Sequence, residues 1–522
     1  MIRTSLHFIR IARAGWVLAR EGVFSQLDPS LVPPGLSLPL TLARLISRNK
    51  AQSGASRLPI AIDRLGPSYV KLGQFLATRP DLIGLEAARA LEVLQDRMAP
   101  FSKEEAIRTI ETAFGQRLDQ IFDEFSEPIA AASIAQVHKA TIRNGAENKN
   151  VAVKILRPGV ERRFNRDLAD MLFAAQFAER NFVEARRLKL IEVVETLSRS
   201  VKMEMDFRLE AAAASEFLEN TQDDPHFRVP KIDWDRTAKS VLTLEWIDGT
   251  PLSDLSALRD RQIDLPALGS LVIQSFLRHA VRDGFFHADM HQGNLFLDLQ
   301  GNLVAVDFGI TGRLGMKERK FLAKILYGFI TRDYHLVASV HFEAGYVPPH
   351  HNIDDFAQAI RAIGEPIHSR TADQISMAKL LTLLFEITSL FDMKTRTELI
   401  LLQKTMVVVE GVARSLNPQL DMWSTAEPVV RSWIEKNLGP VGKLQEAGQT
   451  ISALGLMFMD LPDLVHRGQK AMAQLEARLN SGSEQGGGSI PSSLKDQRSG
   501  FLVLQFSLWI IAALLAILIV MR

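Results

Sequence analysis

The sequence predicts an α+β fold of two lobes, in which a small strand-rich lobe precedes a large helical lobe. Short β-branched runs are confined to residues 128–156 and 240–249, and helical patterns fill most of the remaining chain. An apolar run at the C-terminus adds a predicted transmembrane helix. The predicted parts are a basic N-terminal helix region at 1–45, a helical extension at 46–126, the strand-rich lobe at 127–248, the helical lobe at 249–480, a flexible linker at 481–499 and the apolar helix at 500–522.

The composition is that of an ordinary globular protein. Of 522 residues, 47% are hydrophobic and 23% are charged, which argues against a disordered or fully membrane-embedded chain. The 61 Lys and Arg residues nearly balance the 60 Asp and Glu residues, so no nucleic-acid partner is expected. Because the chain has no cysteine, disulfides, cysteine-ligated zinc, iron–sulfur clusters and thiol nucleophiles are excluded.

The N-terminal segment, MIRTSLHFIRIARAGWVLAREG, is a predicted basic helix. It carries Arg3, Arg10, Arg13 and Arg20 among aliphatic and aromatic residues, and these charges argue against a cleaved signal peptide. A helix of this kind can lie on an anionic membrane surface. It can equally pack on the body of the protein, and the sequence favours neither alternative.

The strands follow a helical stretch over residues 35–125. PIAAASIAQVHKATIRNGAENKNVAVKILRP contains a hairpin, signalled by Asn144 and Gly145, and then the strand VAVKIL. Residues 161–220 return to a helical pattern, and 240–249 form a further strand. From Leu252 the pattern is helical except for NLFLDLQGNLVAVDFG, a hairpin with its turn at Gln300 and Gly301.

The most specific stretch is FHADMHQGNLFLDLQGNLVAVDFG, at residues 286–309. It places Asp289 five residues before Asn294, and Asp307 after the short hairpin. Phosphoryl transfer needs oxygen ligands that hold Mg²⁺ on nucleotide phosphates, and a carboxylate that orients the attacking group. The spacing resembles that of the protein-kinase catalytic loop and the DFG segment that follows it.

Two upstream features complete a kinase-like set. VAVKIL places Lys154 where kinases have the lysine of their VAIK strand, and an alanine-rich segment occupies the position of the phosphate-covering loop. The ordered set predicts a protein-kinase-like two-lobed fold with ATP and Mg²⁺ as cofactors. The residues expected to bind the nucleotide in this segment are Ala130, Ala131, Ala132, Ser133, Ile134, Ala135, Gln136, Val137 and His138.

His287 and His291 flank Asp289 in an HxDxH pattern that could suggest a transition-metal site. No third histidine lies nearby in the sequence, so we reject a metal site of this type. We expect His287 to brace the loop instead.

The sequence also departs from the protein kinases. Alanines stand where a glycine-rich loop would let the backbone approach the phosphates. The segment His287-Ala288-Asp289 lacks the arginine that could receive an activation-loop phosphate, and no APE signal follows the DFG. Phospho-activation and a platform for peptide substrates are therefore not expected.

KLGQ, AAASIAQVH, VAVKILRPG, EMDFRLEA, FHADMHQGN and VDFG together resemble the UbiB family of atypical kinase-like proteins, whose mitochondrial relatives are the ADCK proteins. The resemblance implies ATP-dependent support of ubiquinone biosynthesis at the inner membrane. ATPase activity is its implied chemistry, and the KxGQ segment is expected to occlude the site where a kinase takes its peptide. The implied partners are ATP, polyprenyl-phenol lipid intermediates and other enzymes of ubiquinone biosynthesis.

The resemblance to kinases assigns roles to single residues. Lys154 is expected to contact the α and β phosphates and to pair with Glu210. Asn294 and Asp307 are the expected Mg²⁺ ligands. Asp289 is expected to act either as a general base or as the group that positions water, and the sequence does not separate these roles.

A second group has an expected regulatory role: Lys71, Gly73, Gln74, Glu204 and Asp206. Lys71 and Gln74 share a helical face and could point into the site. Glu204 and Asp206 would point about 200° apart on one helix, unless a helix begins between them. The alternative is that both are surface residues, paired with nearby Arg208 and Lys202.

The C-terminal run, FLVLQFSLWIIAALLAILIVM at 501–521, has only two polar residues. As a helix it would be about 31 Å long, which matches a hydrocarbon core of about 30 Å. We therefore expect a single span, and the family resemblance implies that it lies in the inner (cytoplasmic) membrane. Lys495 and Arg498 precede the run and only Arg522 follows it, which favours a catalytic body on the cytoplasmic side. The alternative is a buried core or dimer helix.

Three functions remain open from the sequence. The first is an ATPase that acts on or presents polyprenyl-phenol intermediates. The second is a kinase that phosphorylates a lipid or protein substrate. The third is a pseudokinase scaffold that uses a nucleotide as a switch and organises a biosynthetic complex.

Overall fold

The computed structural model describes residues 2–24, 41, 45–47, 54–77, 83–91, 93–94, 98–144, 147–181, 183–368, 387, 390–393 and 397–439. They form two compact units. The first contains the described residues up to Leu314 and those of 397–420. The second contains those from Gly315 to Met393 and from Asp421 to Gly439.

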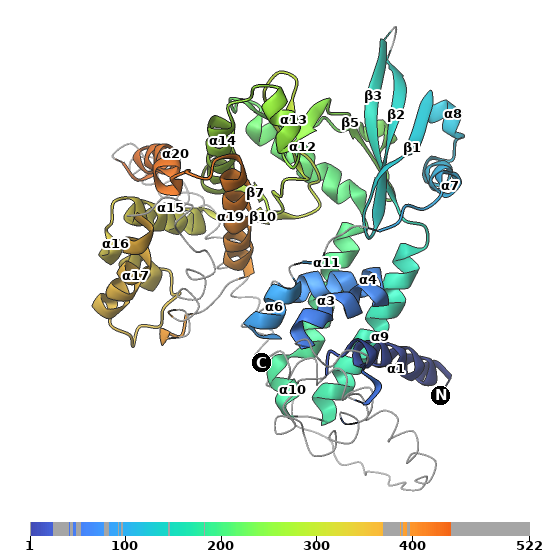
Figure 1. The fold of residues 1–522 in the computed structure, drawn as a ribbon, viewed down its shortest axis with the longest axis horizontal. Coiled ribbons are helices and arrows are strands. Elements are labelled where there is room, and N and C mark those ends of the chain that lie inside the picture. The colour runs from blue at the N-terminus through green and yellow to red at the C-terminus, as the bar shows by residue number, and fades with distance from the viewer. Residues whose placement is uncertain are drawn as a thin grey trace, which may run out of the picture. The chain divides into compact units, whose positions relative to one another are not determined.

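The strand-rich lobe of the first unit is an antiparallel sheet in the order β1-β2-β3-β5 (Figure 1). Its strands are β1 (Glu124–Ala131), β2 (Ala135–Asn144), β3 (Glu147–Leu156) and β5 (Val241–Glu245). Asn144 pairs with Glu147, so β2 and β3 form the hairpin that the sequence predicts.

The two faces of this sheet have different partners. On one face, Val153 and Ile155 pack in a core with Ala106 and Ile110 of α7 (Lys103–Phe114), next to α8 (Leu118–Ile121). The start of α7 is fixed by a capping box between Ser102 and Glu105. Because side chains alternate along a strand, Lys154 lies on the opposite face.

Four helices lie between β3 and β4: α9 (Val160–Asn181), α10 (Val183–Leu188), α11 (Leu190–Glu204) and α12 (Phe207–Thr221). α12 is the element that faces Lys154. It starts at Phe207 because Asp206 caps its N-terminus and accepts a hydrogen bond from the Arg208 backbone N–H at 3.2 Å. The helical pattern predicted over 161–220 is therefore interrupted between Glu204, where α11 ends, and Phe207, where α12 begins.

The helical lobe begins with α13 (Leu255–Asp260) and α14 (Leu265–Arg278), which continues into a π-helical turn at His279–Asp283. A second four-stranded sheet is mixed and has the strand order β4-β9-β8-β6. Its strands are β4 (Phe227–Arg228), β9 (Leu303–Ala305), β8 (Leu295–Asp298) and β6 (Gly249–Pro251). β7 (Phe285–His287) pairs with β10 (Thr311–Arg313), and α19 (Thr397–Leu416) packs on α14. The predicted hairpin is present, and Gly301 adopts φ +86° in its turn.

The N-terminal region forms a helical layer from α1 (Ile2–Glu21), α3 (Gly54–Leu65), α4 (Pro67–Ala77) and α6 (Leu85–Leu91). Leu18, Leu58, Ile62 and Leu91 are among the side chains of its core. A Cβ at Gly73 of α4 would lie 2.4 Å from a Leu94 methyl carbon, so glycine is needed for this close packing.

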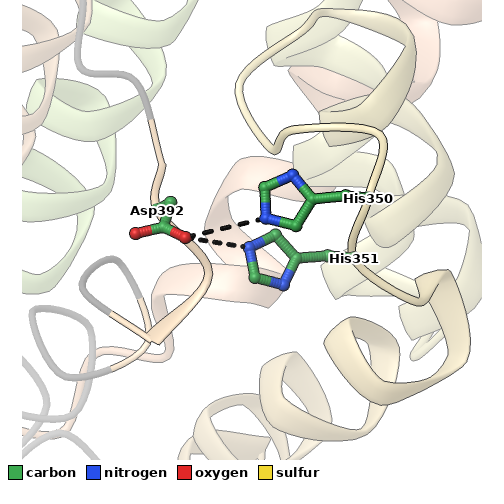
Figure 2. A group of neighbouring side chains, drawn as sticks. All are labelled: His350, His351 and Asp392. Carbon is green, nitrogen blue, oxygen red and sulfur yellow. Dashed lines mark hydrogen bonds and ion pairs between the residues drawn. The ribbon is translucent and has the colours of Figure 1, made fainter.

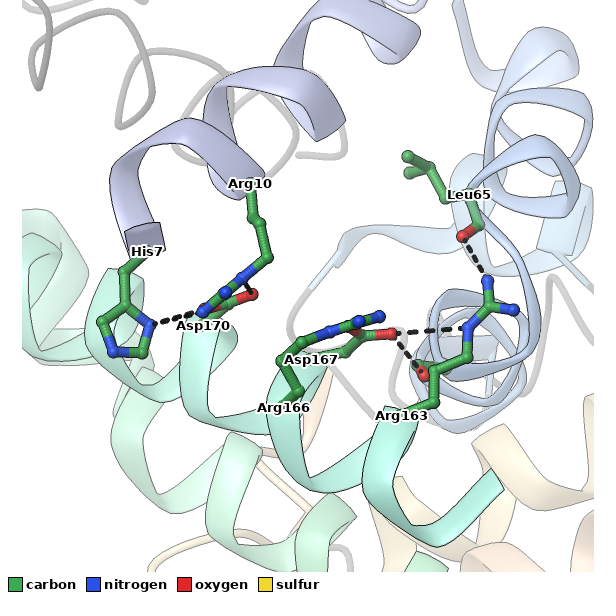
Figure 3. A network of polar contacts seen from close by, with 8 residues as sticks. His7, Arg10, Leu65, Arg163, Arg166, Asp167 and Asp170 are labelled. Carbon is green, nitrogen blue, oxygen red and sulfur yellow. Dashed lines mark hydrogen bonds and ion pairs between the residues drawn. The ribbon is translucent and has the colours of Figure 1, made fainter. Parts of the chain in front are cut away.

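The N-terminal helix packs on the body of the protein, which is one of the two alternatives that the sequence left open. Figure 3 shows His7 and Arg10 of α1 converging on Asp170 of α9. Arg10 Nε lies 2.6 Å from Asp170 Oδ2, and the Asp170 side chain is only 3% exposed. Phe8 packs edge-on against Phe173 at 5.1 Å between ring centroids.

The same helix α9 holds α3 and α4. Ser68 of α4 donates a hydrogen bond to the buried Asp167 at 2.8 Å, and Arg163 donates to the Leu65 carbonyl at 3.4 Å. Asp167 also pairs with Arg166 at 3.0 Å. Figure 3 shows Arg163, Asp167 and Asp170 along one side of α9, so this helix is a common support for the N-terminal layer.

The charged contact predicts a measurable difference between two arginines of α1. Arg10→Ala is expected to weaken the docking of α1 by about 1–2 kcal/mol, because Asp170 stays buried with fewer partners. Arg13, which is exposed on the same helix, provides the matched control Arg13→Ala. Hydrogen–deuterium exchange of the α1 amides should accelerate in the first variant only. Equal exchange in both variants would show that the Asp170 contacts do not hold the helix.

The second unit is built from α15 (Met316–Ile330), α16 (Tyr334–Glu343), α17 (Ile353–His368) and α20 (Met422–Leu438). Tyr334, Val337 and Phe356 are fully buried in its core. Phe391, from the segment before α19, packs in the same core. This unit therefore has its own apolar interior.

The predicted transmembrane helix requires a correction. None of the helices in the described part of the chain is long and apolar enough to cross a membrane. Residues 501–521, on which the prediction rested, lie outside that part, as does the predicted linker at 481–499. An apolar run indicates a span only where it forms a continuous helix of about 20 residues. The prediction of a C-terminal span is therefore wrong for the part of the chain that the structure describes. The inner-membrane location predicted for that span is corrected with it.

Candidate nucleotide site

Lys154 of β3 lies between two carboxylates. Its Nζ is 2.8 Å from Glu210 Oε1 and 3.0 Å from Glu210 Oε2, on α12, and 3.0 Å from Asp307 Oδ2. These three residues come from distant parts of the sequence, and the fold brings them to one point. The phenyl ring of Phe207 adds a cation–π contact at 5.5 Å from Lys154 Nζ.

The position of Glu210 follows from the way α12 begins. Asp206 is the cap and Glu210 lies in the first turn, with its side chain 8% exposed. A carboxylate near a helix N-terminus is favoured by the helix dipole. Each of the two acids at this helix start has a cationic partner: Lys154 pairs with Glu210, and Arg208 pairs with Asp206 at 2.6 Å.

The three charges shift one another. Burial raises the pKa of Glu210 to about 7, although Lys154 opposes the rise. Close packing opposes ionisation of Asp307, but Lys154 outweighs it and lowers the pKa of Asp307 to about 2. Because 46% of the Asp307 side chain is exposed, solvent screens its pair with Lys154. Burial alone would lower the pKa of Lys154, and the two carboxylates raise it above its ordinary value.

Asp307 is positioned by the β8–β9 hairpin. Leu295 pairs with Ala305, so Asn294 and Asp307 emerge at the same end of the hairpin. Asp307 has a left-handed backbone, φ +61°, and its Oδ1 accepts a hydrogen bond from the Gly309 N–H at 3.3 Å. A residue other than glycine in this conformation is uncommon and is often found at functional sites.

Phe308, the next residue, anchors this segment in the core. It is 4% exposed, and its ring centroid lies 5.1 Å from that of Phe217 on α12. It also lies 5.0 Å from the ring of His287. The segment that carries Asp307 is therefore packed against the helix that carries Glu210.

His287 braces the loop, as the sequence analysis expects. Its Nε2 lies 3.0 Å from the Val306 carbonyl oxygen, and its Nδ1 accepts the Asp289 backbone N–H at 3.0 Å. Burial lowers the pKa of His287, which favours the neutral ring that this arrangement requires. With both nitrogens engaged, His287 cannot also ligate a metal, and the HxDxH metal site is excluded on geometry.

Asp289 and Asn294 face the same loop. Asn294 Nδ2 donates to the Asp289 carbonyl at 3.0 Å, so its Oδ1 is the atom of that amide that can ligate a cation. The Asp289 side chain is 44% exposed, and His291 Nε2 is 3.8 Å from its Oδ2. Carboxylate and amide oxygens are hard ligands of the kind that Mg²⁺ requires, so Asp307 and Asn294 fit this ion chemically.

The alanine-rich segment divides into a turn and a strand. Ala130 and Ala131 end β1, residues 132–134 make the turn, and Ala135 starts β2. The Ala132 N–H donates to the Ala135 carbonyl at 2.7 Å. The hydroxyl of Ser133 is buried and has no hydrogen-bond partner among the described residues, so it is a polar group that a phosphate oxygen could satisfy.

Two residues predicted to bind nucleotide point away from Lys154. Val137 pairs with Lys154 across β2 and β3, so these two share a face and their neighbours Gln136 and His138 occupy the other. Gln136 bonds to the Phe101 backbone at 2.9 and 3.2 Å, and His138 Nδ1 lies 2.9 Å from the Ser126 carbonyl oxygen. Gln136 therefore connects the sheet to the segment before α7, and His138 bonds to strand β1 of the same sheet.

Sequence reasoning missed Arg157, which holds the turn in place. Its guanidinium donates to the carbonyls of Ala132 at 3.2 Å and Ala99 at 3.0 Å, and its backbone N–H donates to Ile134 at 2.7 Å. The only sequence signal is its position directly after VAVKIL. An arginine in this place is not distinguishable by pattern from a surface residue.

The KLGQ helix lies against the junction of α11 and α12. Lys71 Nζ is 2.8 Å from Glu204 Oε2, and both side chains are largely buried. α11 ends at Glu204 and α12 is capped by Asp206, which is the break that would let these two acids serve different partners. Gln74 Nε2 donates to the Leu94 carbonyl at 3.4 Å. Glu204 is thus paired with Lys71 rather than standing as a surface charge.

The raised pKa of Glu210 predicts a pH-dependent affinity. Below about pH 7 Glu210 is protonated and loses its charge-assisted contact with Lys154, so affinity for Mg-ATP is expected to rise from about pH 6 to 8. Glu210→Gln should remove this rise, and calorimetric titrations across the range measure it. Because the folded pKa lies above the ordinary value, ionisation of Glu210 also costs stability, which should decline as the pH rises through about 7. If the affinity for Mg-ATP depends on pH in the same way in the wild type and in Glu210→Gln, then Glu210 does not have the role assigned to it.

Comparisons with known proteins agree with this geometry. An ABC1 atypical kinase-like domain matches residues 93–341, and a UbiB helical domain matches residues 360–421. A protein of Marinobacter nauticus named "Probable protein kinase UbiB" is 39% identical over 464 residues, which cover 88% of this chain and 84% of the relative. A protein of the same name from Azotobacter vinelandii is 40% identical over 402 residues, which cover 76% and 74%.

Among solved structures, "The complex structure of Rv3197-erythromycin from Mycobacterium tuberculosis" is 24% identical, with a TM-score of 0.46. It covers 69% of this chain and 90% of its own. The two domain matches and the identities near 40% over most of both chains are sufficient: the protein belongs to the UbiB family of atypical kinase-like proteins.

Proposed function

We propose that this protein is an ATP-hydrolysing member of its family that supports ubiquinone biosynthesis by acting on or presenting polyprenyl-phenol intermediates. The observation that carries the proposal is Lys154 held within 3.0 Å of both Glu210 and Asp307. In a kinase-like chain, a cation held beside a carboxylate of this kind supports the binding of nucleotide phosphates together with a metal ion.

Each residue has a role in this proposal. Lys154 would bind the α and β phosphates while Glu210 holds its ammonium in place. Asp307 and Asn294 would hold Mg²⁺, which when bound neutralises charge on the transferred phosphoryl group. The Ser133 hydroxyl would donate to a phosphate oxygen from the turn.

Asp289 would act on the attacking group. Its backbone is fixed by His287 and Asn294, and its carboxylate is open to solvent. A carboxylate so placed can accept a proton from a hydroxyl or orient a water. ATP hydrolysis needs only the second role.

The position of the KLGQ helix favours a small molecule over a protein as the phosphate acceptor. The ion pair between Lys71 and Glu204 fixes α4 next to the segment that leads to Asp206 and Glu210. A charge pair of low exposure is not opened easily, because separating its members leaves an unpaired charge. A helix fixed there would restrict access of a protein substrate to the nucleotide.

A second candidate is a kinase that phosphorylates a protein. The relatives from Marinobacter nauticus and Azotobacter vinelandii are named probable protein kinases. The position of Asp289 is equally suited to a hydroxyl acceptor.

The two candidates are separated by following the γ-phosphate of labelled Mg-ATP. The full chain should release inorganic phosphate, and a short-chain prenylphenol should stimulate the release, whereas label on a co-purified protein would favour the kinase. Asp307→Asn should remove the release. In cells, the same variant should lower ubiquinone and accumulate an intermediate. Normal ubiquinone in those cells would leave a scaffold role and overturn the ATPase proposal.

A further inference from the structure

We propose that His350, His351 and Asp392 form a binding site for a late first-row divalent metal ion, with Zn²⁺ as the best fit. The three residues lie in the second unit, in the loop between α16 and α17 and in the segment before α19. This site is separate in the chain from the residues assigned to nucleotide, and it does not depend on the proposed function.

The ligand atoms are already near the spacing that a metal needs. Asp392 Oδ2 is 3.3 Å from His351 Nε2 and 3.8 Å from His350 Nε2, and the ligand atoms of all three residues lie within 4.8 Å of one another. A tetrahedral ion with bonds of about 2.0–2.1 Å holds its ligand atoms about 3.3 Å apart. Only a small contraction separates this arrangement from a zinc site.

The direction of the side chains favours a metal over an ordinary hydrogen-bonded group. Figure 2 shows both imidazoles turned toward Asp392, and both Nε2 atoms approach the same carboxylate oxygen. Two protonated rings with centroids 4.2 Å apart would repel each other. A single divalent ion at the point of convergence would satisfy two neutral rings and the carboxylate together.

Both ligand segments are anchored to the core of the second unit. Phe391, the neighbour of Asp392, is 6% exposed and lies 5.0 Å from the ring of Phe356 and 5.3 Å from that of His351. The His351 N–H donates to the Pro348 carbonyl at 3.3 Å. A site whose ligands are held by packed neighbours needs little reorganisation to bind an ion.

The donor set selects the kind of metal. Two imidazoles and one carboxylate suit Zn²⁺, Ni²⁺, Co²⁺ or Cu²⁺, whereas Mg²⁺ prefers oxygen ligands. Three protein ligands on an exposed surface leave a fourth position for water. This chain contains no cysteine, so a zinc site in it must use donors of this type.

The test is a calorimetric titration of the full chain with Zn²⁺ after removal of bound metals with a chelator. We expect the wild type to bind one equivalent of Zn²⁺. His350→Ala, His351→Ala and Asp392→Asn should each abolish this binding or lower its affinity at least about tenfold, because loss of a residue that only supports a metal ligand already has an effect of about that size. His335→Ala is the matched control, because His335 is exposed in the same unit and faces one carboxylate, that of Asp354 at 3.4 Å, with no second histidine beside it among the described residues.

Thermal melting provides a second readout that does not depend on activity. Zn²⁺ should raise the melting temperature of the wild type and of His335→Ala, and not of the three ligand variants. Without Zn²⁺ all the proteins should melt alike. The proposal is overturned if the wild type has no equivalent that the ligand variants lose, if His335→Ala loses it equally, or if Mg²⁺ competes at the same concentration.

Discussion

Replacement of Asp307 by asparagine is expected to lower Mg²⁺-dependent ATP hydrolysis by at least about 100-fold, the usual cost of losing one preorganised charge at a reacting centre. Asp307 is both the predicted metal ligand and one of the two carboxylates within 3.0 Å of Lys154. Its amide replacement keeps the shape and removes the charge. Phosphate release under saturating Mg-ATP is the measurement.

The fold should survive this change, because Lys154 keeps its closer partner, Glu210, and Phe308 still anchors the segment. Asp223→Asn is a matched control, since Asp223 is an exposed aspartate just beyond α12. It should hydrolyse ATP at the wild-type rate. Full activity in Asp307→Asn, with intact folding, would remove Asp307 from the mechanism.

Replacement of Lys154 by methionine is expected to abolish hydrolysis and also to destabilise the protein by about 3 kcal/mol, the range observed when one partner of a buried pair is removed. The Glu210 carboxylate would then be buried beside Asp307 without its cation. Protonation of Glu210 limits the cost, because its pKa is already raised. Urea unfolding at neutral pH measures the loss.

A double variant separates stability from chemistry. Lys154→Met with Glu210→Gln removes both members of the pair, so most of the lost stability should return while hydrolysis stays absent. If the double variant is no more stable than Lys154→Met alone, the contact at 2.8 Å does not contribute as argued here. If either variant hydrolyses ATP at the normal rate, Lys154 does not bind phosphates.

Much of the site could be predicted because its residues lie in local patterns. Lys154 occurs in a strand, Asp307 follows a short hairpin, and Glu210 stands four residues after Asp206 at a helix start. The pairing of Lys154 with Glu210 follows from the resemblance to kinases, in which the lysine of this strand pairs with a helix glutamate. The sequence alone does not decide whether a helix begins at Asp206. An aspartate can cap a helix or lie inside a continuous helical pattern, and here it caps α12.

Other features depend on register and on long-range contacts. The sequence predicts AAASIAQVH to be a single binding loop, but its last four residues belong to strand β2. The alternation of the strand turns Gln136 and His138 to the face opposite Lys154. The contact between Arg10 and Asp170 joins residues 160 positions apart in the sequence, and the contact between His351 and Asp392 joins residues 41 positions apart. No periodicity in a single sequence reports such contacts.

The central claim, that the Lys154 site binds Mg-ATP, is tested most directly by calorimetric titration of the full chain with ATP, with and without Mg²⁺. The account predicts one equivalent of nucleotide whose affinity falls at least about tenfold when Mg²⁺ is removed or when Asp307 is changed to asparagine. Binding that is equally tight in all three experiments would contradict it, because neither the metal nor Asp307 would then contribute to the site.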